Sequence, residues 1–225
     1  MQRIMERLGD AEERAEGAAA RLCEVCADVV DMTGAGIMLM SGDNPRGSVC
    51  SSNQVSALIE ELQLTLGEGP CVDAYDEERP VFEPDLAQPA AVRWPAFTPV
   101  AVAAGARAVF GFPMQVGAIR LGALNVYRDQ PGALSHDQHA DALVMAGVAA
   151  RAVLAMQADA PPGGLAAELE VAFRAVVHQA SGMVAAQLDV GVREALVRLR
   201  AHAFATDSSI AVVAEEVVAR RLRFG

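Results

Sequence analysis

The sequence contains no lysine, because all 18 of its basic residues are arginine. This absence excludes a P-loop nucleotide site, a pyridoxal Schiff base and a protein kinase, each of which depends on a lysine. Long apolar runs are also missing: Arg151 interrupts the longest stretch, whereas a membrane span needs about 20 apolar residues. The first residues are charged and contain no apolar signal core. We therefore expect a cytoplasmic protein that does not enter a membrane.

Aromatic residues are scarce, at 4% of the 225 residues, whereas 52% of the residues are hydrophobic. The chain is long and apolar enough for packed cores, which must consist mainly of Ala, Val, Leu and Met. The formal net charge of −11 is unevenly distributed. Residues 1–164 carry 11 Arg against 22 acidic residues, and residues 165–225 carry 7 of each. Only the C-terminal part is neutral enough to approach the phosphates of a nucleic acid.

The four cysteines are Cys23, Cys26, Cys50 and Cys71. A single Cys-x-x-Cys pair is too few for a structural zinc site, which uses four ligands, so we predict no metal site. Cys23 and Cys26 lie one helical turn apart and have two interpretations. They are small apolar residues of a core, or they form a redox switch or contact a metal.

The N-terminal segment, about residues 3–31, is predicted to be one long helix. Its apolar residues follow alternating spacings of four and three, which is a heptad pattern. They are Ile4, Leu8, Ala11, Ala15, Ala18, Leu22, Val25 and Val29. Two alternatives explain this pattern: the helix lies on the sheet of its own domain, or it pairs with a second copy of the chain.

The middle of the chain alternates short strands with helices. Strands are predicted at residues 36–40, 47–51, 80–83, 108–114 and 121–127, with a turn at 41–45. A short helix is predicted at 54–63, with Val55, Leu58, Ile59 and Leu62 on its apolar face. Ser135 is a suitable N-cap for a long helix from Asp137 to Gln157.

The segment Pro161-Pro162-Gly163-Gly164 cannot continue a helix and marks a domain boundary. We therefore predict an N-terminal domain over residues 1–158, a linker over 159–164 and a C-terminal domain over 165–225. Apolar residues in the last part recur at helical spacing in three segments, the third of them capped by Thr206 or Asp207. This pattern predicts a small bundle of three helices.

The most specific segment of the N-terminal part is Gly67-Glu68-Gly69-Pro70-Cys71, followed by Asp73, Pro80-Val81 and Trp94-Pro95. With these motifs and the order of its elements, the region from residue 15 to 158 resembles a GAF domain. The resemblance implies an α+β fold: an antiparallel sheet with helices packed on one face and a ligand-sized pocket on the other. The whole chain is then a GAF-like sheet flanked by helices, followed by an all-α bundle of three helices.

The turn at Gly67–Cys71 has two interpretations. In one, Glu68, Cys71, Asp73 and Trp94 contact a small-molecule ligand in the pocket; in the other, the turn organises the fold and Trp94 fills space beneath the long loop. GAF domains bind many kinds of small molecule or none. The cyclic-nucleotide signature of the family cannot be complete without a lysine, and neither His136 nor His139 specifies haem. No cofactor is therefore predicted.

The C-terminal segments Val177–Val184, Glu194-Ala195, Leu199-Arg200, Ala203–Ala205 and Val212–Ala214 resemble an ANTAR domain. The resemblance implies a homodimeric module that binds paired stem-loops in leader transcripts and prevents transcription termination. The residues expected to contact RNA are Gln179, Ser181, Gly182, Arg193, Arg198, Arg200, His202, Arg220 and Arg221. Ser181 stands where many family members have a lysine, so the arginines must supply the attraction for phosphate. The alternative is that these arginines only form a solvated face with Glu194, Glu215 and Glu216.

These observations favour a non-enzymatic regulator in which a sensor domain controls an RNA-binding antiterminator. Two other functions stay open. The chain could be a signalling adaptor that dimerises through its first helix and binds protein rather than RNA. It could also reduce methionine sulfoxide, as some GAF-like domains do with cysteines, using Cys71 and Cys50.

Overall fold

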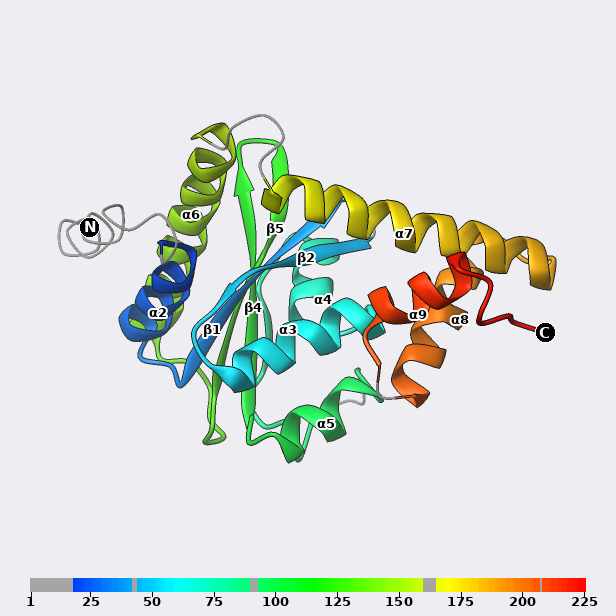
Figure 1. The fold of residues 1–225 in the computed structure, drawn as a ribbon. Coiled ribbons are helices and arrows are strands. Elements are labelled where there is room, and N and C mark those ends of the chain that lie inside the picture. Colours follow the sequence, from blue (N-terminus) through cyan, green and yellow to red (C-terminus); the bar gives the residue numbers. More distant parts are fainter. Residues whose placement is uncertain (1–17, 42–43, 90–92, 160–164, 207) are drawn as a thin grey trace. The chain divides into compact units, whose positions relative to one another are not determined.

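The computed structural model describes residues 18–41, 44–89, 93–159, 165–206 and 208–225 (Figure 1). The chain forms two compact units. The N-terminal unit comprises Met1–Leu64 and Glu68–Asp159, and the C-terminal unit comprises Thr65–Gly67 and Ala160–Gly225. Most of the segment predicted as a linker, residues 160–164, lies outside the described residues. Each unit is described by itself.

The N-terminal unit is built on a five-stranded sheet in the order β2-β1-β5-β4-β3, in which all neighbours are antiparallel. The strands are β1 (Gly34–Ser41), β2 (Asn44–Ser51), β3 (Val81–Glu83), β4 (Ala108–Val116) and β5 (Ile119–Arg128). All five predicted strands are therefore present. Alternation and turn residues identified them because each strand is bounded by Gly, Pro, Ser or Asp.

Helices α2 (Ala18–Val30) and α6 (His136–Asp159) cover one face of this sheet (Figure 1). The core beneath them includes Ile37, Phe110, Phe112 and Leu124, all fully buried. The predicted cap of α6 is confirmed, because Ser135 Oγ accepts a hydrogen bond of 3.1 Å from the backbone N–H of Gln138. By length and composition alone, His136–Met156 is long and apolar enough to cross a membrane, and 39% of its apolar window is buried inside the unit.

The described part of the N-terminal heptad pattern belongs to the core of its own unit. Leu22 and Val25 of α2 are buried in the core, and Val29 of the same helix packs against this core. For these residues the heptad pattern reflects a helix that lies on the sheet of its own domain, the first of the two alternatives. The residues from Ile4 to Ala15 lie outside the described part of the chain, so pairing with a second copy stays a prediction.

The opposite face of the sheet is covered by α3 (Gln54–Leu66) and α4 (Pro70–Glu77), and α5 (Phe97–Ala103) follows the long loop (Figure 1). The implied arrangement with helices on only one face is therefore wrong. Helix α4 lies directly on the sheet: a β-carbon on Gly111 would come within 2.2 Å of the Pro70 carbonyl oxygen. Close contact at this glycine brings the start of α4 onto β4.

The C-terminal unit contains the three predicted helices, α7 (Leu165–Leu188), α8 (Val192–Ala205) and α9 (Ile210–Val218). Their core is aliphatic; its fully buried members are Ala180, Val184, Ala195, Leu199, Ala203, Ala214 and Val217. The N-cap of α9 is Ser209, which accepts from the Val212 N–H, and not Thr206. Thr206 instead ends α8, where its hydroxyl donates to the His202 carbonyl at 2.8 Å. Asp207, the other predicted cap, lies outside the described residues.

Candidate functional site

Helix α3 turns polar side chains toward the sheet. Ser56, Glu60 and Gln63 are buried, with exposed fractions of 0%, 1% and 0%, whereas Leu58 is 37% exposed. Their spacings of four and three place them on one face of the helix. The predicted apolar face of this helix is therefore partly wrong. Leu58 points outward, and Ser56, Glu60 and Gln63 form a polar stripe on the buried face.

The strand beneath this stripe has a polar residue at its centre. Asn125 of β5 is completely buried, and its cross-strand partners are Gly36 on β1 and Gly111 on β4. Residues directly opposite one another share a face of the sheet, so the neighbouring strands contribute no side chain on either side of Asn125. The Glu60 side chain occupies the position above Gly36, where a β-carbon would come within 2.5 Å of its Oε1.

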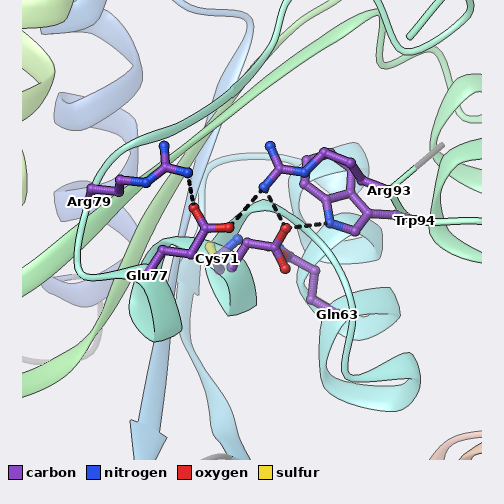
Figure 2. Close-up of polar contacts among 7 residues, drawn as sticks. Gln63, Cys71, Glu77, Arg79, Arg93 and Trp94 are labelled. Atoms are coloured by element: carbon purple, nitrogen blue, oxygen red, sulfur yellow. Dashed lines mark hydrogen bonds and ion pairs between the residues drawn. The ribbon is translucent and has the colours of Figure 1, made fainter. Parts of the chain in front are cut away.

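We call Glu60, Gln63, Cys71 and Asn125 the buried polar cluster. The Cys71 N–H donates to Gln63 Oε1 at 2.7 Å; both residues are labelled in Figure 2. Within the described residues, several other polar atoms here have no hydrogen-bond partner: both Glu60 oxygens, Gln63 Nε2 and both amide atoms of Asn125. Each buried polar group without a partner costs about 1–3 kcal/mol, so these atoms favour contact with a polar ligand or an ordered water.

Burial controls protonation in this cluster. It raises the pKa of Glu60 from 4.5 to about 8, and the nearby Asn125 amide lowers this pKa only in part. Burial also raises the pKa of the Cys71 thiol well above 9.0, and the adjacent Glu60 carboxyl raises it further. At neutral pH the cluster therefore holds a protonated carboxyl and a protonated thiol, and it offers hydrogen-bond donors as well as acceptors.

The predicted ligand residue Glu68 makes contacts within the protein. Its Oε1 accepts hydrogen bonds of 2.8 Å from the backbone N–H groups of both Ala96 and Phe97, at the start of α5. The glycines on each side of Glu68 adopt positive φ, 67° at Gly67 and 137° at Gly69, which confirms the special backbone expected of this turn. Glu68 therefore connects the turn to the first residues of α5.

Asp73 and Trp94, two more predicted ligand residues, contact each other. The indole Nε1 of Trp94 donates to Asp73 Oδ2 at 3.0 Å, and Arg93 Nη2 donates to the same oxygen at 2.8 Å (Figure 2). Trp94 is only 2% exposed and packs edge-to-face on Phe97, with ring centroids 5.7 Å apart. Glu77 also pairs with Arg93, and Arg79 pairs with Glu77. These contacts favour the interpretation in which Trp94 holds the long loop.

The cysteines pair in a way that their sequence spacing does not indicate. Cys23 of α2 forms a disulfide with Cys50 of β2, whereas Cys26 and Cys71 are free and buried. Cys50 belongs to the core under α2 and α6, whereas Cys71 belongs to α4 on the other face of the sheet. The structure therefore does not bring Cys71 and Cys50 together, as the methionine sulfoxide reductase alternative required.

Three of the predicted RNA-contacting residues lie in α7. Gln179 and Gly182 are exposed, and the space around Gly182 is open: a β-carbon there would meet no atom within 4 Å. The approach of a helix within the unit therefore does not explain this glycine. Ser181 is only 2% exposed, and its hydroxyl donates to the Val177 carbonyl at 2.8 Å. Its side chain is satisfied inside its own helix.

The predicted residues of α8 differ in exposure. Arg198 is exposed and pairs with Glu194 one turn earlier at 3.0 Å. Arg200 is half-buried, and the side chain of Arg193 lies outside the described part of the structure. His202 packs its ring edge-to-face against Phe224, with centroids 5.3 Å apart.

The C-terminal tail supplies the remaining arginines. Arg220, Arg221 and Arg223 are exposed, and Arg221 makes a bidentate pair with Glu216 at 2.7 and 2.9 Å. The Phe224 N–H donates to Gln187 Oε1 at 2.8 Å. Because Phe224 also contacts His202, the tail is held against the ends of α7 and α8, close to one predicted residue of α8.

Sequence reasoning missed Glu60, Gln63, Asn125 and the contacts of Phe224. Two signals pointed to the first three: the spacing of polar residues in an otherwise apolar helix, and a lone Asn inside the apolar strand Leu121–Tyr127. The Phe224 contacts had no comparable signal, because a single aromatic residue at a chain end has no periodicity.

Comparisons with known proteins agree with this architecture. The GAF domain family matches residues 12–155, and the ANTAR domain family matches residues 166–218. A comparison with curated proteins finds no match. Among solved structures, a domain of a putative two-component sensor histidine kinase from Sinorhizobium meliloti is similar, with 16% identity and a TM-score of 0.52 over 65% of this chain and 94% of that chain.

Two further solved structures share the fold of the N-terminal unit. The GAF domain of an Acinetobacter phosphoenolpyruvate-protein phosphotransferase is 13% identical, with a TM-score of 0.51 over 69% of this chain and 95% of its own. A free methionine-R-sulfoxide reductase from Neisseria meningitidis is 14% identical, with a TM-score of 0.50 over 70% of this chain and 92% of its own. Such identities show the fold alone. The chain belongs to the GAF domain family, and an ANTAR domain follows its GAF domain.

Proposed function

We propose that the protein is a cytoplasmic regulator whose ANTAR domain binds paired RNA stem-loops as a homodimer and prevents transcription termination. The observation that carries the proposal is the exposure of several arginines in the ANTAR unit. Arg198, Arg220, Arg221 and Arg223 are exposed on the part of the chain that lacks the acidic excess.

The acidic partners of these arginines do not oppose RNA binding strongly. Arg198 and Arg221 pair with Glu194 and Glu216 at the surface, where an ion pair contributes only about 0–1 kcal/mol. A phosphate group can therefore replace the carboxylate at little cost, and an arginine can bind phosphate through two hydrogen bonds. Since the unit has equal numbers of basic and acidic residues, each copy binds modestly, and two linked copies gain affinity from two contacts.

Binding of the full chain to an RNA with two hairpins tests this proposal, with a single hairpin and an unfolded RNA as competitors. Replacing Arg198 and Arg220 together by Ala is expected to weaken binding by roughly 10-fold or more and to reduce the slope of log K against log salt. Arg79→Ala is the matched control, because Arg79 is an exposed, glutamate-paired arginine of the GAF unit. Equal affinity for all three RNAs, or an equal effect of both changes, contradicts the proposal.

For the GAF unit we propose that a small polar molecule binds at the buried polar cluster. The unpartnered atoms of Glu60, Gln63 and Asn125 support this position over the predicted one, because Glu68, Asp73 and Trp94 already contact protein groups. Native mass spectrometry and an absorption spectrum of the purified full chain test it. Added mass or colour in the wild type that is lost in Asn125→Leu supports the site, and retention in that variant contradicts it.

We propose no enzymatic activity. The Cys71 thiol, which the reductase alternative needed as a nucleophile, has a pKa raised by burial, whereas reactive thiols have a lowered one. The RNA experiment also tests the adaptor alternative, because an adaptor does not discriminate between the three RNAs. An adaptor is expected instead to capture a protein partner after nuclease treatment.

A further inference from the structure

The disulfide between Cys23 and Cys50 connects a helix to the edge of the GAF sheet. Cys23 lies in α2, Cys50 lies in β2, and their Cα atoms are 6.0 Å apart although 27 residues separate them. Cys50 is the cross-strand partner of Ile37, whose side chain belongs to the core under α2 and α6. The Cys50 side chain therefore points from the sheet edge toward α2.

Strand β2 is an edge strand of the described sheet. It pairs with β1 alone, and its pairing is irregular between Ile37 and Met38 and again between Leu39 and Met40. It also contains Pro45 and Gly47, residue types that weaken a strand. A covalent bond from this strand to α2 therefore changes how firmly both elements are held.

The other two thiols are poor targets for oxidation. Cys26 and Cys71 are both 0% exposed, and burial raises the pKa of Cys26 to about 12 and that of Cys71 well above its ordinary value. Because oxidants react with accessible thiolates, these two positions are protected. Cys50, at 8% exposed and on an edge strand, is the more accessible member of the bonded pair, since Cys23 is at 0%.

We propose that Cys23 and Cys50 form a reversible thiol–disulfide site that takes a peroxide as oxidant and fixes α2 to β2. This inference rests on the proposed function in one respect: an RNA-binding regulator works inside the cell, where thiols are kept reduced. Disulfides of intracellular proteins are usually transient, catalytic or redox-sensing rather than structural. The bond then reports oxidising conditions instead of serving only as a fixed cross-link.

The chemistry balances with hydrogen peroxide as the oxidant. The Cys50 thiolate attacks one peroxide oxygen, the O–O bond breaks, and the products are a sulfenic acid and, after protonation, water. The Cys23 sulfur then attacks the Cys50 sulfur, the S–O bond breaks and a second water leaves as the S–S bond forms. Two thiols are oxidised and one peroxide is reduced. A dithiol or glutathione reverses the step by thiol–disulfide exchange.

Alkylation and intact mass measurement of the folded full chain test the site. The folded protein is reduced mildly, treated with or without peroxide, and then alkylated in denaturant, which gives the reagent access to the buried Cys23 sulfur. Without peroxide the reagent is expected to add at Cys23 and Cys50, and after peroxide treatment this uptake is lost at both. Cys50→Ser should abolish the protection of Cys23 by peroxide, whereas Cys26→Ala, one turn from Cys23, should keep it. Cys23→Ser should stop the oxidation of Cys50 at the sulfenic acid, which adds oxygen to the intact mass instead of forming a disulfide. Protection by peroxide that persists in Cys50→Ser overturns the proposal, as does its absence in the wild type.

A redox site differs from a structural disulfide because its bond can be reduced again in the folded protein. This reversibility is measured on the wild-type protein alone. A glutathione buffer with the reduced form in large excess should open the bond in the folded protein, and hydrogen exchange of the α2 amides should then become faster. A bond that opens only in denaturant, or α2 amides that exchange equally in both forms, overturns the proposal. RNA binding measured in parallel keeps the two proposals apart: its failure in both forms contradicts the proposed function, and the alkylation result still decides this site.

Discussion

The side chain of Glu60 lies directly over Gly36, where a β-carbon would come within 2.5 Å of Oε1 and 2.7 Å of Cγ. A carboxyl group thus fills the space that a glycine leaves on a buried strand, next to the unpartnered amide of Asn125. This contact places an ionisable group in the interior of the GAF unit, where its protonation affects the stability of the fold.

Glu60→Gln is expected to remove a pH dependence of stability. The pKa of Glu60 is about 8 in the folded protein and 4.5 for an unperturbed carboxyl, so the folded state holds the proton more tightly. Its contribution to stability is fully present below pH 4.5 and declines as pH rises through 8, because the unfolded chain ionises first. Relative to wild type, the variant should gain on the order of 4 kcal/mol between these limits. Urea unfolding at several pH values measures this gain, and a difference that does not vary with pH contradicts it.

Gly36→Ala is expected to destabilise the GAF unit by about 1–3 kcal/mol, because the added methyl group forces the Glu60 side chain to move. In a Glu60→Ala background the same change should cost much less, since the three atoms nearest to the added carbon all belong to Glu60. A double-mutant cycle in urea isolates this coupling. Equal costs in the two backgrounds would show that the contact does not limit residue 36.

The strands and the longer helices were predictable because each has enough residues to show a period. Helices α4 and α5 were missed, since their 8 and 7 residues form only two turns, and the start of α4 is hidden by the Gly-Glu-Gly-Pro turn. Pro70 at the first position of α4 suits a helix start, but in sequence it looked like the end of a turn. The Cys23–Cys50 bond joins the helix before the β1–β2 hairpin to the second strand of that hairpin, and no local spacing indicates such a pair.

The proposed ligand site differs from the predicted one for a related reason. The motif around Glu68 is conspicuous because it contains unusual residues, yet the structure uses them to hold α5 and the long loop. Glu60 and Asn125 lie within an apolar helix and an apolar strand. The periodic pattern identifies such elements from their many apolar residues and gives no role to a single polar residue among them. These two polar residues carry unpartnered atoms from which we place the ligand.

Asp73→Ala is expected to destabilise the GAF unit by about 1–3 kcal/mol, because it leaves the buried Trp94 N–H without its acceptor. Asp73→Asn keeps an acceptor oxygen and should cost less, although it weakens the pair with Arg93. Arg93→Ala should cost under about 1 kcal/mol, since that ion pair is partly exposed. Trp94 is the only tryptophan of the chain, so its fluorescence follows the site directly. Equal stability of the Ala and wild-type proteins would argue against this anchoring role.

Gly182→Ala separates folding from binding in the ANTAR unit. The residue is exposed within α7 and has open space around it, so the added methyl group meets nothing in the protein and should stabilise the helix by about 0.5–1 kcal/mol. If RNA or a second copy of the chain approaches the backbone at this glycine, the same methyl group should weaken RNA binding severalfold. Gly147→Ala is the matched control, because Gly147 lies within α6 with equally open surroundings in the other unit. Both variants should unfold at higher urea, and only Gly182→Ala should bind RNA less tightly; unchanged RNA affinity in Gly182→Ala would remove this glycine from the proposed interface.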